Sequence, residues 1–155
     1  MTAYTQQAID RVVEDVNGMI DKVEQKKHFF SVSAWLNYSP IAIYARVQYR
    51  LCDGKALRVV TIANIEIEEQ YQRQGIFKEL LTNLERLAKI RNFDAIVAES
   101  LNNYDLRDYL LRVGFKPINQ HELMIAMTLY REVNREQADE MQLRVRNQAE
   151  HQVRP

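Results

Sequence analysis

The residues with the clearest capacity for chemistry lie in one stretch, "EIEEQYQRQGIFKELL", which covers 66–81. Gly75, one of only four glycines in the chain, stands there between a polar loop and a run with helical periodicity. A glycine at the start of a helix lets a ligand approach the backbone, and the N–H groups of a first helical turn attract anions because they lack partners inside the helix. Arg73 and the amides of Gln72 and Gln74 supply further donors. The stretch therefore predicts a phosphate site, with simple packing of the glycine as the alternative.

The composition excludes several other kinds of site. The 155 residues include 21 Lys and Arg against 21 Asp and Glu, so no basic excess favours general binding of nucleic acid. The lone Cys52 cannot form a disulfide within the chain, and the scattered His28, His121 and His151 predict no metal site. No apolar run approaches the ~20 residues of a membrane span, and the first residues do not read as a secretory signal. We expect a cytoplasmic protein.

The elements that must position this stretch follow from hydrophobic periodicity. Apolar residues at three- and four-residue spacing predict helices, and alternating β-branched and aromatic residues predict strands. In chain order we expect a helix over 5–26, strands over 28–36, 41–51 and 56–67, a helix over 75–91, a strand over 94–100, a helix that begins at Asn102 or Asn103 and ends before Gly114, and a strand over 121–130.

Turn signals predict how these elements connect. The tripeptide at 38–40 and the pair Asp53-Gly54 separate the first three strands, so we expect an antiparallel meander. A helix joins the strand over 56–67 to the strand over 94–100, which predicts a parallel pair with a right-handed crossover. We therefore expect one domain over 1–132. The polar segment 133–155 is expected to be a solvated or partner-bound tail, with a helix around 135–148 as the alternative.

Two motifs in this order resemble those of the GNAT superfamily of N-acyltransferases. The stretch "IEIEEQYQRQGIFKELL" is similar to its acyl-CoA-binding motif, in which Gln or Arg, two residues, Gly and one residue precede Gly or Ala. Gln72, Gly75 and Phe77 occupy those three places. The later segment "NYDLRDYLLRVGF" is similar to the family's helix that opens with Asn and closes with Gly-Phe, here at Asn103 and at 114–115. The resemblance covers about residues 5–130.

The resemblance implies an α+β (α/β/α) fold with a mixed, mostly antiparallel sheet, in which the parallel strand pair is splayed. Because a single helix leads into the strand over 28–36, it implies a form of this fold that is shortened at the N-terminus. Acetyl-CoA would be the co-substrate, with no metal. Its pantetheine arm would pair with the backbone near Ile65, Glu66 and Ile67, and Asn103 would contact it from the neighbouring helix. The pyrophosphate would lie on the backbone amides of Gln72, Arg73, Gln74, Gly75, Ile76 and Phe77.

The chain departs from the family where catalysis is concerned. Direct attack of an amine on a thioester needs a base for the amine proton and often an acid for the leaving thiolate. Where many relatives carry a tyrosine, this chain has Leu110, and where some carry a glutamate it has Ala98. Acidic residues that others carry in the central strand correspond to Thr61 or Ala63.

The remaining acid–base candidates are few. The sequence offers Glu66, Glu68, Tyr104 and Tyr109, of which we select Glu66 and Tyr109. A solvated carboxylate is the alternative role for Glu66, and a packing role is the alternative for Tyr109. Phe77 also departs from the motif, and we expect its ring to turn into the core.

The sequence therefore predicts an N-acetyltransferase that moves an acetyl group from acetyl-CoA to a primary amine by direct attack. The acceptor could be a protein N-terminus, a lysine or a polyamine-like molecule. The alternative is a GNAT-fold protein with reduced catalysis that serves as a binding or structural component of a larger assembly. A homodimer, or a protein partner bound through the C-terminal tail, is compatible with both. An unrelated α+β module with a chance motif would bind no coenzyme A.

Overall fold

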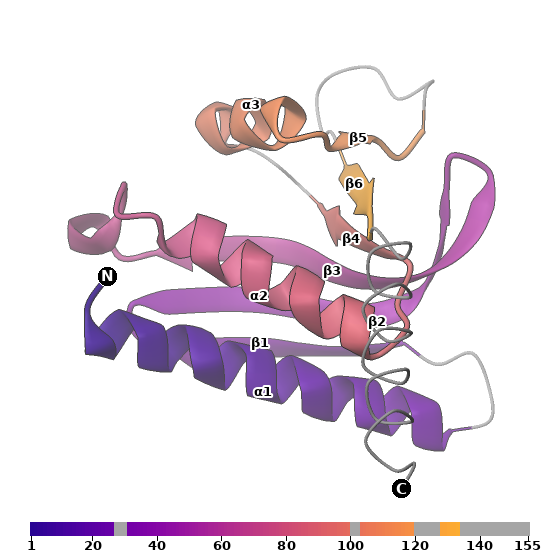
Figure 1. The fold of residues 1–155 in the computed structure, drawn as a ribbon, viewed down its shortest axis with the longest axis horizontal. Coiled ribbons are helices and arrows are strands. Elements are labelled where there is room, and N and C mark those ends of the chain that lie inside the picture. Colours follow the sequence, from indigo (N-terminus) through magenta and orange to yellow (C-terminus); the bar gives the residue numbers. More distant parts are fainter. Residues whose placement is uncertain (27–30, 100–102, 120–127, 134–155) are drawn as a thin grey trace, which may run out of the picture.

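The computed structural model describes residues 1–26, 31–99, 103–119 and 128–133, in which helices pack against a single sheet (Figure 1). In chain order the elements are α1 (Ala3–Gln25), β1 (Val32–Tyr38), β2 (Ile41–Cys52), β3 (Lys55–Ile67), the short 3-10 helix η1 (Glu69–Tyr71), α2 (Ile76–Ile90), β4 (Ala95–Ala98), α3 (Tyr104–Arg112), β5 (Lys116–Pro117) and β6 (Leu129–Glu132).

The strands form one mixed sheet in the order β1-β2-β3-β4-β6-β5. The first three strands pair antiparallel, and β3 pairs parallel with β4. Asp53 and Gly54 have positive φ angles of 52° and 80° and join β2 to β3 in a two-residue hairpin. The antiparallel meander was predicted from the turn signals and the parallel pair from the helix that connects its strands, and both are confirmed.

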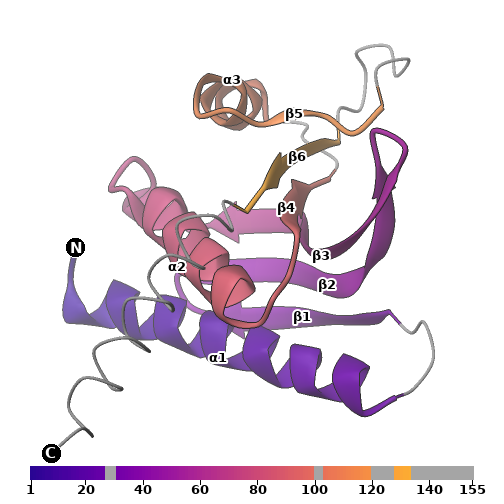
Figure 2. The same cartoon turned by 45° about the vertical axis from the view of Figure 1, so that its right-hand side comes forward.

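Helices α1 and α2 cover one face of the sheet, which we call the helix face (Figure 2). The apolar residues of α1 recur every three or four positions, and Ile9, Val12, Val16 and Ile20 are fully buried against the strands. The stripe of α2 is buried in the same way, so both helices share one hydrophobic core with the sheet. This core holds the strands that carry the candidate site in fixed register.

The face of the sheet opposite the helix face, which we call the second face, carries polar and aromatic side chains on β1 and β2. Cross-strand pairing places Ser33 beside Arg46 and Trp35 beside Tyr44 on this face. Trp35 is 53% exposed. Toward β4 and β6 the second face holds a smaller apolar cluster, which consists of Cys52, Val59, Ala95, Val97, Ile118 and Tyr130.

The later part of the chain differs in detail from the predicted elements. The short strand β5 was not predicted, because two residues carry no periodic signal. The strand expected over 121–130 overlaps β6 only at Leu129 and Tyr130, and β6 continues to Glu132. Residues 120–127 and 134–155 lie outside the described residues, so the predicted role of the C-terminal tail stays a prediction. Among the described helices, none has the length and apolarity to span a membrane.

A forked strand pair beside a glycine-led helix as the candidate functional site

The strands β3 and β4 part after four residue pairs, at a point that we call the fork (Ile62, Ala63 and Glu99). Pairing runs from Val59 with Ala95 to Ile62 with Ala98, and the Glu99 N–H donates to the Ile62 carbonyl at 2.9 Å. β3 then continues to Ile67 without a partner strand on this side among the described residues. The splayed parallel pair that the resemblance implied is therefore present.

A β-bulge at the fork decides which backbone groups face the gap. Tyr44 pairs with Asn64 and Ala45 pairs with Ile62, so Ala63 is the extra residue. Beyond the bulge, the Glu68 N–H donates to Pro40 O at 3.0 Å, on the side of β2.

Backbone groups alternate in direction along a strand. Because Glu68 faces β2, the N–H and C=O groups of Ile65 and Ile67 face the gap between β3 and β4. The Ile67 carbonyl accepts a hydrogen bond from Gln72 Nε2 at 2.9 Å. This bond ties the loop after β3 to the edge of β3 that lines the gap.

The N-terminus of α2 presents free backbone donors. Gly75, the N-cap residue, is left-handed with φ 79° and ψ 11°, and no side chain caps the helix. The Glu79 N–H donates to the Gly75 carbonyl at 3.0 Å. The N–H groups of Ile76 and Phe77 therefore precede the first intrahelical bond and have no acceptor within the helix. A Cβ added at Gly75 would meet nothing within 4 Å, so the space above this glycine is open.

The polar side chains of the loop take two different roles. Gln72 and Gln74 donate to backbone carbonyls of the same segment, Gln74 Nε2 to Gln70 O at 3.0 Å. These two side chains therefore stabilise the loop itself. The sequence had predicted instead that their amides would be donors for a phosphate. Arg73 is exposed and left-handed with φ 61°, and it forms no ion pair with any residue that the structure describes. The donors turned outward are therefore the backbone amides and the Arg73 guanidinium.

Asn103 is the N-cap of the later helix α3 and is one of the two residues that the sequence predicted for this position. The Asn103 side chain accepts a hydrogen bond from the Leu106 N–H at 3.1 Å and so caps α3. Further along α3, the ring of Tyr109 meets Phe77 edge-on, with 6.2 Å between ring centroids and 79° between planes. The Phe77 ring thus packs against the core, as expected from its bulk.

The two candidate catalytic residues lie on different sides of β3. Glu66 pairs with Ala42 on the second face, and it lines a pocket of about 460 Å³ with Ser39 and Glu68. Tyr109 packs against the core of the helix face through Phe77. The structure therefore separates the pair that the sequence put forward together.

The positions where relatives carry acid–base groups are apolar and closed in this chain. Leu110 is fully buried and Ala98 is 2% exposed, and both belong to the main core. Tyr104 is 68% exposed, with the Arg107 guanidinium 4.6 Å above its ring. Among the candidates, Glu66 and Glu68 line a described pocket, which lies between the start of β2 and the end of β3.

A cluster of charges on the second face was missed by the sequence reasoning. Arg46 Nη1 lies 3.4 Å from both carboxylate oxygens of Glu99, and Arg50 contacts the same carboxylate. The Tyr44 and Ser33 hydroxyls are hydrogen-bonded at 3.0 Å, and this bond, together with Arg46 nearby, lowers the pKa of Tyr44. The signal was the even-numbered spacing of 44, 46 and 50, which places three polar residues on one face of a strand.

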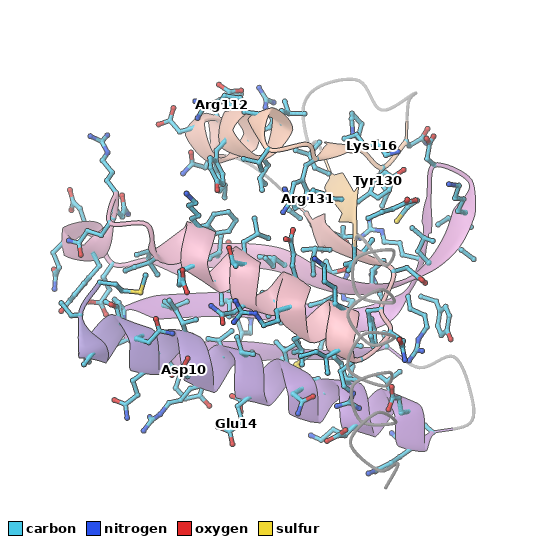
Figure 3. All side chains as sticks on the ribbon, in the orientation of Figure 1. Asp10, Glu14, Arg112, Lys116, Tyr130 and Arg131 are labelled. Carbon is cyan, nitrogen blue, oxygen red and sulfur yellow. The ribbon has the colours of Figure 1, made fainter. Side chains whose placement is uncertain are left out.

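Within the described residues, no group of His, Cys, Asp and Glu side chains could hold a metal ion. The side chains and backbone amides around the fork are instead suited to an elongated ligand with an anionic end. Figure 3 shows the side chains that surround α2 and the strands.

The chain is similar to one protein family and to several solved structures. The model of the Acetyltransferase (GNAT) family matches residues 6–115. None of the curated proteins matches the chain significantly. Among solved structures, the ribosomal-protein-S18-alanine N-acetyltransferase from Escherichia coli is 18% identical with a TM-score of 0.44, and the match covers 73% of this chain and 74% of that chain.

Two further structures are similar over shorter segments. Ard1 from Thermoplasma volcanium is 15% identical with a TM-score of 0.41, over 59% of this chain and 70% of that chain. The protein yncA from Salmonella typhimurium, solved with its cofactor acetyl-CoA, is 13% identical with a TM-score of 0.39, over 61% of this chain and 64% of that chain. This chain thus spans less than two thirds of yncA. The family model, in contrast, matches well over half of the chain, including the fork and the start of α2; the chain belongs to the GNAT acetyltransferase family.

Proposed function

We propose that the protein is an N-acetyltransferase that transfers an acetyl group from acetyl-CoA to a primary amine by direct attack. One observation carries the proposal: the free backbone groups of β3 and the uncapped start of α2 belong to one connected site. The link is the hydrogen bond from the Gln72 side chain to the Ile67 carbonyl, which joins the loop before α2 to the edge of β3 that lines the gap. A coenzyme with a diphosphate and an amide-containing arm matches this arrangement.

The cofactor roles follow from the direction of each group. The pyrophosphate would accept hydrogen bonds from the amides between Gln72 and Phe77, where the helix dipole favours negative charge. Arg73 would pair with a phosphate from the exposed side of the loop. The pantetheine arm would lie along Ile65 and Ile67, whose N–H groups face the gap. Asn103 would contact the arm from the start of α3.

The chemistry requires one bond to form and one to break. The amine nitrogen attacks the thioester carbonyl carbon, the tetrahedral intermediate collapses, and the carbon–sulfur bond breaks to release the coenzyme A thiolate. A β3 amide facing the gap would hold the oxyanion. Glu66 would take the amine proton from its pocket, directly or through a water, and Tyr109 is the candidate to protonate the thiolate.

A specific observation also supports the alternative of a GNAT-fold protein with reduced catalysis. Leu110 and Ala98 are buried at the two positions where the resemblance implies acid–base groups. Such a protein would keep the cofactor site but would transfer no acetyl group. It would serve as a binding or structural component.

Two measurements test the proposal and separate it from this alternative. Calorimetric titration with acetyl-CoA, and separately with free coenzyme A, should show micromolar binding of both. Release of free thiol in the presence of a panel of primary amines should then exceed the rate without amine. Binding without amine-dependent release would support the reduced-catalysis alternative. Absence of binding by a folded sample would overturn the cofactor site altogether.

A further inference from the structure

Among the described contacts, the charge cluster beside the fork joins two cations to one anion. It consists of two guanidinium groups, Arg46 and Arg50, and one carboxylate, Glu99. Their side chains are partly buried, with 27% of each arginine and 15% of the glutamate exposed. Partial burial weakens the screening of charges by water, so a local net charge of about +1 acts more strongly on a nearby ligand here than on an open surface.

Within the cluster the two arginines are held differently. Arg50 makes the close contact with Glu99 Oε1. Arg46 presents only Nη1 to this carboxylate, at 3.4 Å from each oxygen, which is long for a charged hydrogen bond. Its guanidinium carbon lies 5.7 Å from the ring centroid of Tyr44. Arg46 also contacts the Tyr44 hydroxyl, so the donors available for another anion are the N–H groups that serve neither Glu99 nor Tyr44.

Arg46 lies next to the fork, where the proposed cofactor site begins. It pairs with Thr61 across β2 and β3, one residue before Ile62 at the fork. The Thr61 hydroxyl is fully buried and has no hydrogen-bond partner among the described residues. A buried hydroxyl without a partner is costly, and such a group calls for an explanation by strain, by a functional role or by a bound water or ion.

The same face offers contacts for the body of a small molecule. Trp35 and Tyr44 form a ring pair with 5.2 Å between centroids. Ala42, Tyr44 and Arg46 point to this face in succession, and Ala42 is opposite Glu66. Positions 42 and 46 are four residues apart, so about 13 Å of strand separates the backbone at Glu66 from the backbone at Arg46, and the reach of these two long side chains shortens the span that a ligand has to bridge. Tyr44 and Asn64 lie between them.

Resting on the proposed function, we propose that Arg46 binds a carboxylate of the acceptor, so that the acceptor class is a primary amine that carries a carboxylate several bonds from its amino group. Glu66 then receives the amine end, and the guanidinium receives the anionic end through paired N–H donors. A polyamine has no anion to offer Arg46, and its second cation is repelled by the cluster. The proposal therefore favours an acceptor with a carboxylate over a polyamine, whereas the sequence offered no reason to choose between them.

The test uses matched probes that differ only in the carboxylate: lysine with cadaverine, and 5-aminopentanoate with pentylamine. With acetyl-CoA saturating, we expect kcat/KM to be about tenfold or more higher for the carboxylate-bearing member of each pair. Arg46→Gln should abolish this preference by raising KM for lysine and 5-aminopentanoate while leaving kcat and both carboxylate-free amines unchanged. Arg46→Lys should restore part of it because the charge remains.

The control is Arg58→Gln, since the Arg58 side chain has a similar exposure of 28% but pairs with Glu24 on α1. It should leave the preference intact. Three outcomes would overturn the proposal. They are equal rates within each pair, a preference for cadaverine over lysine, and an equal effect of Arg46→Gln on all four probes.

A second measurement keeps the inference separate from the proposed function. Binding of 5-aminopentanoate and pentylamine to the protein with coenzyme A, followed by NMR without turnover, reports the Arg46 site alone. Carboxylate-dependent binding that Arg46→Gln removes supports the subsite even if no acetyl group is transferred. Carboxylate-independent binding, or no binding while coenzyme A binds, overturns it.

Discussion

Glu99 donates its backbone N–H to the carbonyl of Ile62, and this contact closes the pairing of β3 with β4 among the described residues. One residue later, at Ala63, the bulge reverses which backbone groups of β3 face the gap. The proposed cofactor site and the proposed acceptor site both begin at this point. The Glu99 side chain also holds the two arginines of the second face, so one residue contributes to the fork and to the charge cluster.

The first prediction concerns the glycine that leads α2. Gly75→Ala should reduce the affinity for acetyl-CoA by at least about tenfold, because a Cβ would occupy the open space above the free amides. The measurement is calorimetric titration. Gly54→Ala is the matched control, since Gly54 has φ 80° against 79° for Gly75 and equal space around it. Both variants should lose about 1–2 kcal/mol of stability from left-handed strain, but only Gly75→Ala should lose affinity. Equal affinities in the two variants would speak against the anion site.

A second prediction addresses proton transfer. Glu66→Gln should lower kcat by about a hundredfold or more, because the amide cannot accept the amine proton, and it should leave acetyl-CoA affinity unchanged. Steady-state kinetics with the best acceptor provides the measurement. Glu68→Gln is the control, since Glu68 lines the same pocket but already accepts a hydrogen bond from the Ser39 hydroxyl. If both variants retain full kcat, solvent or another group takes the proton.

The third prediction concerns the attachment of β6. Arg131 and Tyr130 leave β6 in opposite directions (Figure 3). The Arg131 guanidinium pairs with Glu85 of α2, donates to the Val113 carbonyl at 2.5 Å and lies 4.9 Å from the Phe115 ring centroid. Arg131→Met should lower the free energy of unfolding by about 2 kcal/mol because it leaves partly buried acceptors without a donor.

The matched control for Arg131 is an exposed ion pair between β3 and the end of β6. Lys55 lies 3.6 Å from Glu132, with 68% and 45% of the two side chains exposed. Lys55→Met should change stability by at most about 1 kcal/mol in urea unfolding. A loss in the control as large as that in Arg131→Met would show that net charge, rather than the Arg131 contacts, sets the stability.

The fourth prediction is a pH dependence that centres on Cys52. Burial raises the pKa of the Cys52 thiol to about 11 from its ordinary value of 9.0. A raised pKa means that the folded state binds the thiol proton more tightly than the unfolded state. This stabilisation is complete below pH 9 and is lost as the pH rises from 9 toward 11. The native thiol should also resist alkylation at pH 8 and react only after unfolding.

Urea unfolding at pH 7 and at pH 10 checks this dependence. The wild-type protein should lose more stability between the two values than Cys52→Ala, in which the thiol is absent. Equal losses in both proteins would assign the alkaline destabilisation to other groups.

Much of the fold could be predicted because its signals are local. Asp53-Gly54 specifies a two-residue turn, and the apolar stripes of α1 and α2 specify which faces are buried. The sequence also contained a signal for the bulge, although we did not use it. The apolar positions of β3 change from even to odd between Ile62 and Ile65, and such a change of parity on one buried face requires an extra residue.

The free amides at the start of α2 were accessible from sequence for the same reason. Gly75 and the loop before it form a contiguous segment, so the local order of residues determines the geometry of the free amides. The roles of Gln72 and Gln74 were less accessible, because side-chain bonds to the loop depend on the path of the chain after β3.

The sequence by itself determined the family, the order of the elements and the position of the glycine-led helix, because these depend on neighbours within a few residues. Only the tertiary structure decided what surrounds the fork. Arg46 and Glu99 are 53 positions apart in the chain and meet only after β2, β3 and β4 assemble in register. Likewise, Glu66 and Tyr109 are separated because β3 stands between their faces. Contacts of this kind depend on sheet register, which is a property of the whole packed core and not of any one segment.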